Sequence, residues 1–167
     1  MKEIFTDQEK VQILADLVAI KSVNDHELQV AKYLQRLFAK YGITAKLLPL
    51  AANRADLVAE IGSGDPVLGV SGHMDVVTAG ELTQWHSDPF TLTERDGHLY
   101  GRGATDMKSG LAVLVIAMIT IQQNHLLKRG TIRLMATAGE EVGEQGSRYL
   151  KDQGYICLLY TSPSPRD

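Results

Sequence analysis

The chain has 167 residues, of which 44% are hydrophobic and 22% are charged, an ordinary composition for one globular domain with a real core. A net charge of -3, with Lys and Arg scattered along the chain, excludes a basic surface for nucleic acid. The single cysteine, the absence of a signal-peptide pattern and the lack of an apolar run of about 20 residues predict a cytoplasmic protein without a disulfide framework or membrane span.

Two amphipathic helices are expected first. Thr6 and Glu9 have the spacing of a capping box, and an apolar stripe follows at helical intervals. Asn24 and Glu27 repeat this start signal, and the second stripe runs toward Gly42, a typical residue beyond a helix end. Both stripes indicate core packing, and we assign no chemistry to them.

Strands are expected next, at residues 44–50, 55–61 and 67–71. The third is a short continuous apolar run, which is typical of a strand buried on both faces. A hairpin is expected around Asp96 and Gly97.

A buried helix is expected at residues 107–124, because this segment is apolar nearly all round. A further strand follows at residues 131–137. Strand, crossover helix and strand form a βαβ unit, so the predicted fold class is α/β, a mostly parallel sheet with helices on both faces.

Two adjacent acids, Glu140 and Glu141, follow the last of these strands. Charges at the end of a core strand are costly unless a cation or another partner compensates them. Because neighbouring side chains diverge, one acid can bind a metal while the other acts as a general base toward water. For the pair alone, a solvated acidic turn is the alternative.

His73 and Asp75 end an earlier strand, and side chains two positions apart project to the same side. His73 can bind a metal while Asp75 holds the other imidazole nitrogen, or the two can form a local hydrogen bond without a metal. Asp106 stands in a glycine-rich loop before the long helix, where it can bridge two cations or favour the helix dipole. The three motifs together, all at strand ends or helix starts, favour a hydrolytic metal centre.

Four segments carry a resemblance to a known family: residues 71–77 (SGHMDVV), 85–90 (WHSDPF), 99–110 (LYGRGATDMKSG) and 136–143 (ATAGEEVG). Together they resemble the dimetal aminoacylase and carboxypeptidase family (zinc peptidase-deacylases), whose members include succinyl-diaminopimelate desuccinylase and acetylornithine deacetylase. The resemblance runs from near the N-terminus to about Tyr155. It implies a zinc-exopeptidase-like catalytic domain that hydrolyses an amide bond.

The resemblance also implies roles for the site residues. His73 would bind one metal ion, Glu141 the other, and Asp106 would bridge both. Asp75 would orient His73, and Glu140 would be the catalytic acid and base. Two divalent ions are implied, zinc or cobalt, with manganese as a further option.

The expected reaction is hydrolysis of the amide bond of an N-acyl amino acid, of the succinyl-diaminopimelate or acetylornithine type. A dipeptidase or carboxypeptidase on the same scaffold is the second hypothesis. The expected partner is a small N-acyl amino acid or peptide rather than a nucleic acid or a membrane, and a homodimer is one option for a full-length form.

Beyond residue 155 the chain departs from the family pattern, which expects a further strand ending in an acidic ligand. No acid follows Asp152 before the final Asp167, and the lid or dimerisation domain and a late histidine are missing. We therefore expect residues 1–155 to be the N-terminal part of a catalytic domain and residues 156–167 to be a departing tail. A third hypothesis follows, in which the isolated chain is an inactive, metal-binding fragment.

Overall fold

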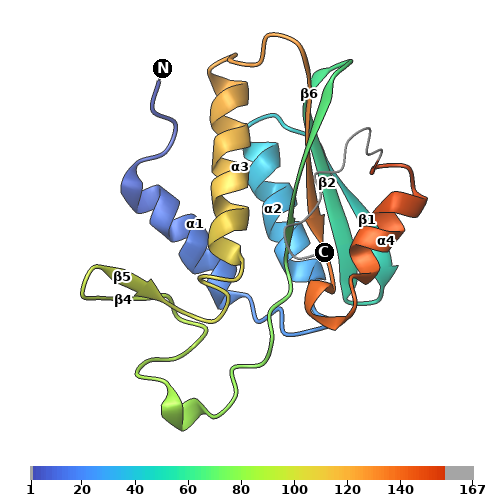
Figure 1. Ribbon diagram of the computed structural model, residues 1–167. Helices are drawn as coiled ribbons and strands as arrows, with labels where there is room; N and C mark the ends of the chain where they lie inside the picture. Colours follow the sequence, from blue (N-terminus) through green and yellow to red (C-terminus); the bar gives the residue numbers. More distant parts are fainter. Residues whose placement is uncertain (1, 157–167) are drawn as a thin grey trace, which may run out of the picture.

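The computed structural model describes residues 2–156. They form a four-stranded sheet, a two-stranded hairpin and helices on both faces of the larger sheet (Figure 1). The helices are α1 (Asp7–Ala19), α2 (Leu28–Lys40), α3 (Lys108–Gln123) and α4 (Gln145–Asp152), with 3₁₀ turns η1 (Leu82–Gln84) and η2 (Glu140–Val142). The strands are β1 (Ala45–Ala51), β2 (Arg54–Ser63), β3 (Val67–His73), β4 (Thr93–Arg95), β5 (His98–Tyr100) and β6 (Gly130–Thr137).

The larger sheet has the strand order β1-β2-β6-β3. The α/β class with flanking helices is confirmed, and β3, α3 and β6 form the expected parallel unit. The expectation of a mostly parallel sheet is wrong for the described strands, since β1 with β2 and β2 with β6 are antiparallel. Only residues 52–53 join β1 to β2, and so short a connection permits only an antiparallel pair.

The third predicted strand also differs from expectation. Val67 is 44% exposed and Leu68 is 59% exposed, so β3 is not buried on both faces as its apolar run predicted. Within the described residues β3 is the last strand of the sheet and has a neighbour on one side only. A continuous apolar run does not distinguish such an edge strand from a central one.

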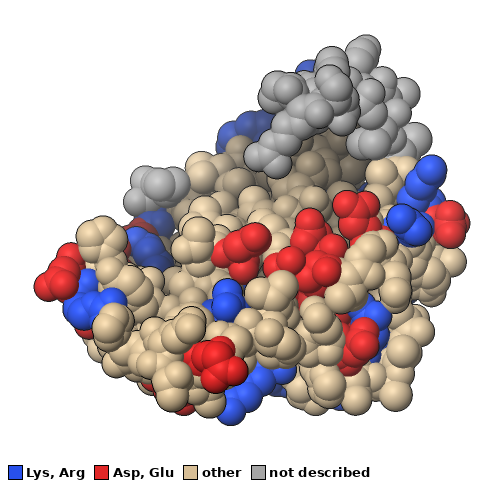
Figure 2. Space-filling model, turned by 60° about the horizontal axis from the view of Figure 1, so that its bottom comes forward, with Lys and Arg blue, Asp and Glu red and all other residues tan. Residues whose placement is uncertain are grey.

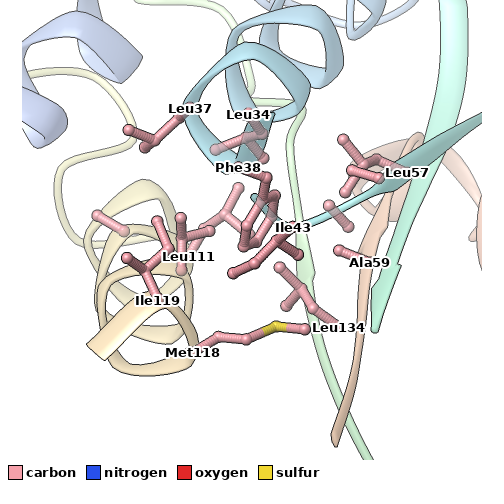
Figure 3. Packing of buried hydrophobic residues seen from close by; sticks show 14 of the residues in the cluster. Leu34, Leu37, Phe38, Ile43, Leu57, Ala59, Leu111, Met118, Ile119 and Leu134 are labelled. Atoms are coloured by element: carbon pink, nitrogen blue, oxygen red, sulfur yellow. The ribbon is translucent and has the colours of Figure 1, made fainter. Parts of the chain in front are cut away.

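Helices α2 and α3 pack on one face of the sheet, α1 packs against α3 on the same side, and the short α4 packs on the other face (Figure 1). Side chains alternate along β2, so Leu57 joins the core under α2 and α3 while Val58 packs with Leu150 of α4. Figure 3 shows the main core between α2, α3 and the sheet. The residues labelled there are Leu34, Leu37, Phe38, Ile43, Leu57, Ala59, Leu111, Met118, Ile119 and Leu134.

The two predicted helix starts have different outcomes. Thr6 and Glu9 form the expected capping box at α1. The start predicted at Asn24 is wrong, because α2 begins at Leu28 and Glu27 makes no side-chain cap bond. The carboxylate of Glu27 is buried and pairs with Arg54 instead.

The remaining elements agree with the sequence pattern. Asp96 and Gly97 both have positive φ in the turn between β4 and β5, and α3 and β6 match their predicted ranges within one residue. None of the helices in residues 2–156 is long and apolar enough to span a bilayer. Of the predicted tail, residues 157–167 lie outside the described part of the chain.

Candidate metal centre

The predicted site residues gather at one end of the sheet. His73 ends β3 and is paired with Thr137, which ends β6, because parallel strands bring their carboxyl ends together. Beyond β6 the chain turns at Gly139, with φ of +75°, into η2, which carries Glu140 and Glu141. Acidic side chains cluster on this face of the molecule, the lower end in Figure 1 turned forward in Figure 2.

His73 is the centre of this cluster. Its Nε2 lies 2.9 Å from Oδ1 of Asp106 and 3.9 Å from Oε2 of Glu140. One ligand atom from each of His73, Glu140 and Glu141 falls within 4.8 Å of the others. The imidazole is only 6% exposed whereas the Asp106 side chain is 76% exposed, so a buried nitrogen meets carboxylates that open toward solvent.

The surrounding charges favour a cation at this point. Burial lowers the pKa of His73, but the hydrogen bond to Asp106 and the contacts with Asp75 and Glu140 raise that pKa above its ordinary value overall. Burial raises the pKa of Glu141, and the nearby His73 opposes this. A divalent cation binds the neutral imidazole and would satisfy the same carboxylates in place of the proton.

Asp75 is fully buried and contacts both His73 and the backbone of residues 139–141. Its carboxylate accepts hydrogen bonds from the backbone N–H groups of Gly139, Glu140 and Glu141, at 3.0, 3.1 and 3.0 Å. Its backbone carbonyl lies 2.9 Å from Nδ1 of His73, and its Oδ1 lies 3.7 Å from the same nitrogen. That Asp75 orients His73 stays a prediction, with the backbone carbonyl nearest to the ring.

The donor atoms suit a divalent cation. An imidazole nitrogen of His73 converges with carboxylate oxygens of two further segments, Asp106 and Glu140–Glu141, and zinc accepts such a mixed set. The residues described therefore fit the metal that the sequence pattern predicts, with His73, Asp106 and Glu141 as the expected ligands.

The sequence pattern did not predict a second group of charged residues, which supports the acidic cluster from β2 and the start of α2. The guanidinium of Arg54 donates to Glu27 and to Oε1 of Gln145, and Oδ1 of Asp56 accepts the N–H of Ala138. Burial raises the pKa of Asp56 to about 6. The detectable signal was the charge at position 56 inside a predicted core strand, since a buried charge needs a partner.

The sequence matches a family model described as peptidase family M20/M25/M40 over residues 69–160. It is 52% identical over 153 residues to a protein of Staphylococcus epidermidis named probable succinyl-diaminopimelate desuccinylase, a match that covers 92% of this chain and 38% of that protein. It is 35% identical over 138 residues to a succinyl-diaminopimelate desuccinylase of Wolbachia from Brugia malayi, covering 81% and 34%. The chain thus spans less than two fifths of the length of these curated relatives.

Solved structures share the fold. Human carnosine dipeptidase 1 superposes with a TM-score of 0.74 at 27% identity, covering 87% of this chain and 35% of that one. A metallo-carboxypeptidase of the M20 family from Sulfolobus solfataricus superposes with a TM-score of 0.78 at 23% identity, covering 88% and 35%.

Proposed function

Because this chain belongs to peptidase family M20/M25/M40, we propose that residues 1–155 form the N-terminal part of the catalytic domain of a metal-dependent amidohydrolase. The supporting observation is the convergence of His73, Glu140 and Glu141 within 4.8 Å at the end of the β3–β6 pair, with Asp106 in contact with His73. The reaction is proposed for a polypeptide of the length of the relatives, because this chain spans only 38% of the Staphylococcus epidermidis relative.

The proposed ligands come from three segments. His73 would hold one ion and Glu141 a second, with Asp106 shared between them, and zinc or cobalt suits these donors. A bound divalent ion acts as a Lewis acid that polarises the carbonyl of the scissile amide. Asp75 keeps the backbone of residues 139–141 in place and so presents both glutamates.

Glu140 is the proposed acid and base. Its side chain is about half exposed and lies beside His73, so water and substrate can reach it. The carboxylate takes a proton from the water that adds to the amide carbon, and it returns that proton to the nitrogen as the C–N bond breaks. The products are a carboxylate and an amine.

The proposed substrate is an N-succinyl diamino acid. The support is the name shared by relatives in Staphylococcus epidermidis and Wolbachia, the former 52% identical to this chain. A dipeptidase is the second candidate, favoured by the 27% identity to human carnosine dipeptidase 1. Turnover of N-succinyl-diaminopimelate against a panel of dipeptides separates the two.

The first test is metal binding by the 167-residue chain, measured by calorimetry with Zn²⁺ or Co²⁺. Glu141→Ala should weaken binding at least about tenfold, as loss of a ligand does, whereas Glu144→Gln, at an exposed acid of the same loop, should not. Equal affinity in wild type and Glu141→Ala would remove Glu141 from the site.

The second test is turnover by a longer polypeptide that joins residues 1–155 to the remainder of the Staphylococcus epidermidis relative. Glu140→Gln should lower kcat by about 10²- to 10⁴-fold with unchanged metal content, because the proton carrier is lost. Turnover retained in this variant would refute the role of Glu140. For the 167-residue chain alone we expect metal binding without hydrolysis, since the chain spans only 38% of the relative on whose name the proposed reaction rests.

A further inference from the structure

We propose that Arg54 is a positioning residue for the segment 138–145, called here the site loop, which carries Glu140 and Glu141. Arg54 is the first residue of β2, and the hydrogen-bond and ion-pair partners of its side chain among the described residues are Asp25, Glu27 and Gln145. Its role would be to fix where the two glutamates stand relative to His73. The part of the test that uses metal binding rests on the proposed function, whereas the part that uses loop protection does not.

The first observation is how firmly Arg54 itself is anchored. Its side chain is 9% exposed, and its Nε and Nη2 donate to the fully buried carboxylate of Glu27 at 3.1 and 3.0 Å. Its Nη1 lies 2.7 Å from Oδ1 of Asp25. A two-point guanidinium–carboxylate pair of this kind has a defined orientation, so the guanidinium is a rigid support at the start of α2.

The second observation is that the same guanidinium also contacts the site loop. Nη1 donates to Oε1 of Gln145 at 2.8 Å, which ties down the end of the loop. At the other end, a Cβ added to Gly139 would lie 2.3 Å from Nη2 of Arg54, so the guanidinium packs directly against the backbone there. Gly139 immediately precedes Glu140 and Glu141.

The third observation is that β2 supports the loop at a neighbouring point. Asp56 lies two positions beyond Arg54 on the same side of the strand, and its Oδ1 accepts the N–H of Ala138 at 2.8 Å. Asp75, two residues beyond the end of β3, accepts the backbone N–H groups of residues 139–141. The site loop is therefore held from β2 and from the segment that follows β3, and Arg54 contacts it at Gly139 and at Gln145.

The geometry distinguishes positioning from simple stabilisation. Loss of Arg54 would leave the buried Glu27 without its cation, which destabilises the fold for reasons unrelated to the loop. Gln145→Ala, in contrast, removes only the loop-side contact and leaves the pair with Glu27 intact. Gln145→Glu keeps an acceptor for Nη1 and serves as the rescuing variant.

The experiment compares the full 167-residue chain with Gln145→Ala, Gln145→Glu and Arg54→Lys. The control is Arg133→Lys, at a strand arginine that pairs with Glu60 on β2 and does not contact the loop. Two quantities are measured: the exchange rates of the amides of residues 139–141 by NMR, and the affinity for Co²⁺ by its visible absorption. The melting temperature is recorded for each variant.

We expect Gln145→Ala and Arg54→Lys to raise the hydrogen-exchange rates of the amides of residues 139–141 by about tenfold. This is the effect of losing one hydrogen bond to a charged group. Co²⁺ affinity should fall by about tenfold, as for other residues that orient metal ligands. Gln145→Glu should restore both quantities, and Arg133→Lys should change neither.

The proposal is overturned if Gln145→Ala leaves amide exchange within about twofold of wild type, whether or not Arg54→Lys folds. It is equally overturned if Arg133→Lys raises the exchange rates of the same amides as much as Gln145→Ala does. If the wild-type chain binds no Co²⁺, the proposed function fails, and amide exchange alone still decides the role of Arg54.

Discussion

Two fully buried carboxylates, Asp56 and Asp75, face the site loop and are compensated differently. Asp75 accepts three backbone N–H groups, whereas Asp56 accepts one. Oδ2 of Asp56 has no hydrogen-bond partner among the described residues. Burial therefore raises the pKa of Asp56 to about 6, and the nearby Glu27 adds to the effect.

The raised pKa of Asp56 predicts how the free energy of unfolding depends on pH. Between pH 3.8, the ordinary pKa, and about 6, the folded chain keeps a proton on Asp56 that the unfolded chain has lost. The contribution of Asp56 to the free energy of unfolding thus falls as pH rises through this window. Asp56→Asn keeps Oδ1 as acceptor without the charge, so its stability relative to wild type should improve by about 2 kcal/mol between pH 4 and 7.

Urea unfolding of both proteins at several pH values measures this difference. Asp88→Asn is the control, since the exposed Asp88 also accepts a backbone N–H, from Phe90 at 2.9 Å. A constant difference between Asp56→Asn and wild type across pH 4 to 7 would contradict the elevated pKa. If the asparagine side chain lowers stability equally at every pH, the change of this difference with pH is unaffected.

At the scale of elements, the turn from β6 into η2 depends on Gly139. Its φ of +75° lies in the left-handed region, and a Cβ there would also meet Arg54 at 2.3 Å. Gly139→Ala should therefore cost more than left-handed strain alone, which is about 1–2 kcal/mol. Gly80→Ala is the matched control, because Gly80 has φ of +70° and open space around its Cα.

Urea unfolding and Co²⁺ binding of the two alanine variants measure the contribution of the contact with Arg54. Gly139→Ala should be the less stable by at least about 1 kcal/mol, as expected from steric overlap in a packed site, and only this variant should bind Co²⁺ more weakly. Equal losses in both variants would show that backbone strain explains the whole effect.

The elements that local pattern determines were predictable from the sequence. Thr6 and Glu9 cap α1 as their spacing indicates, and Asp96-Gly97 forms its hairpin turn. Glu27 was misread because a capping signal is local, while its actual partner Arg54 is 27 positions away. Strand neighbours are likewise set by the whole sheet, which is why the edge position of β3 could not be inferred from its apolar run.

The same division holds for the site. The sequence pattern selected His73, Asp75, Asp106 and the two glutamates, and the structure brings all five to one end of the sheet. Their supports were not predictable in the same way. Arg54 and Asp56 act through contacts across the sheet with the site loop, and no fixed spacing along the chain encodes such contacts.

For the whole molecule, the clustered carboxylates predict that divalent ions stabilise the fold. A ligand that binds only the folded chain at 100 times its Kd adds about 2.7 kcal/mol, which raises the melting temperature by roughly 5–10 °C for a domain of this size. Zn²⁺ or Co²⁺ should produce this shift, and EDTA should reverse it. Differential scanning fluorimetry measures the change.

The matched variants are His73→Ala, which removes the central ligand, and His98→Ala, which removes an exposed histidine of the hairpin. Only His73→Ala should abolish the shift. A shift of equal size in His73→Ala would mean that the ions bind elsewhere on the acidic surface.

The position of β6 in the sheet has a consequence for the order of folding. β2 and β3 are close neighbours along the chain, yet β6 lies between them in the sheet. Until residues 130–137 have been made, the inner edges of β2 and β3 lack their native partner, and unpaired edges invite association with other chains. β6 also brings Glu140 and Glu141 to His73, so insertion of this one strand both closes the sheet and assembles the acidic cluster. Metal binding would therefore report that β6 has been inserted between β2 and β3.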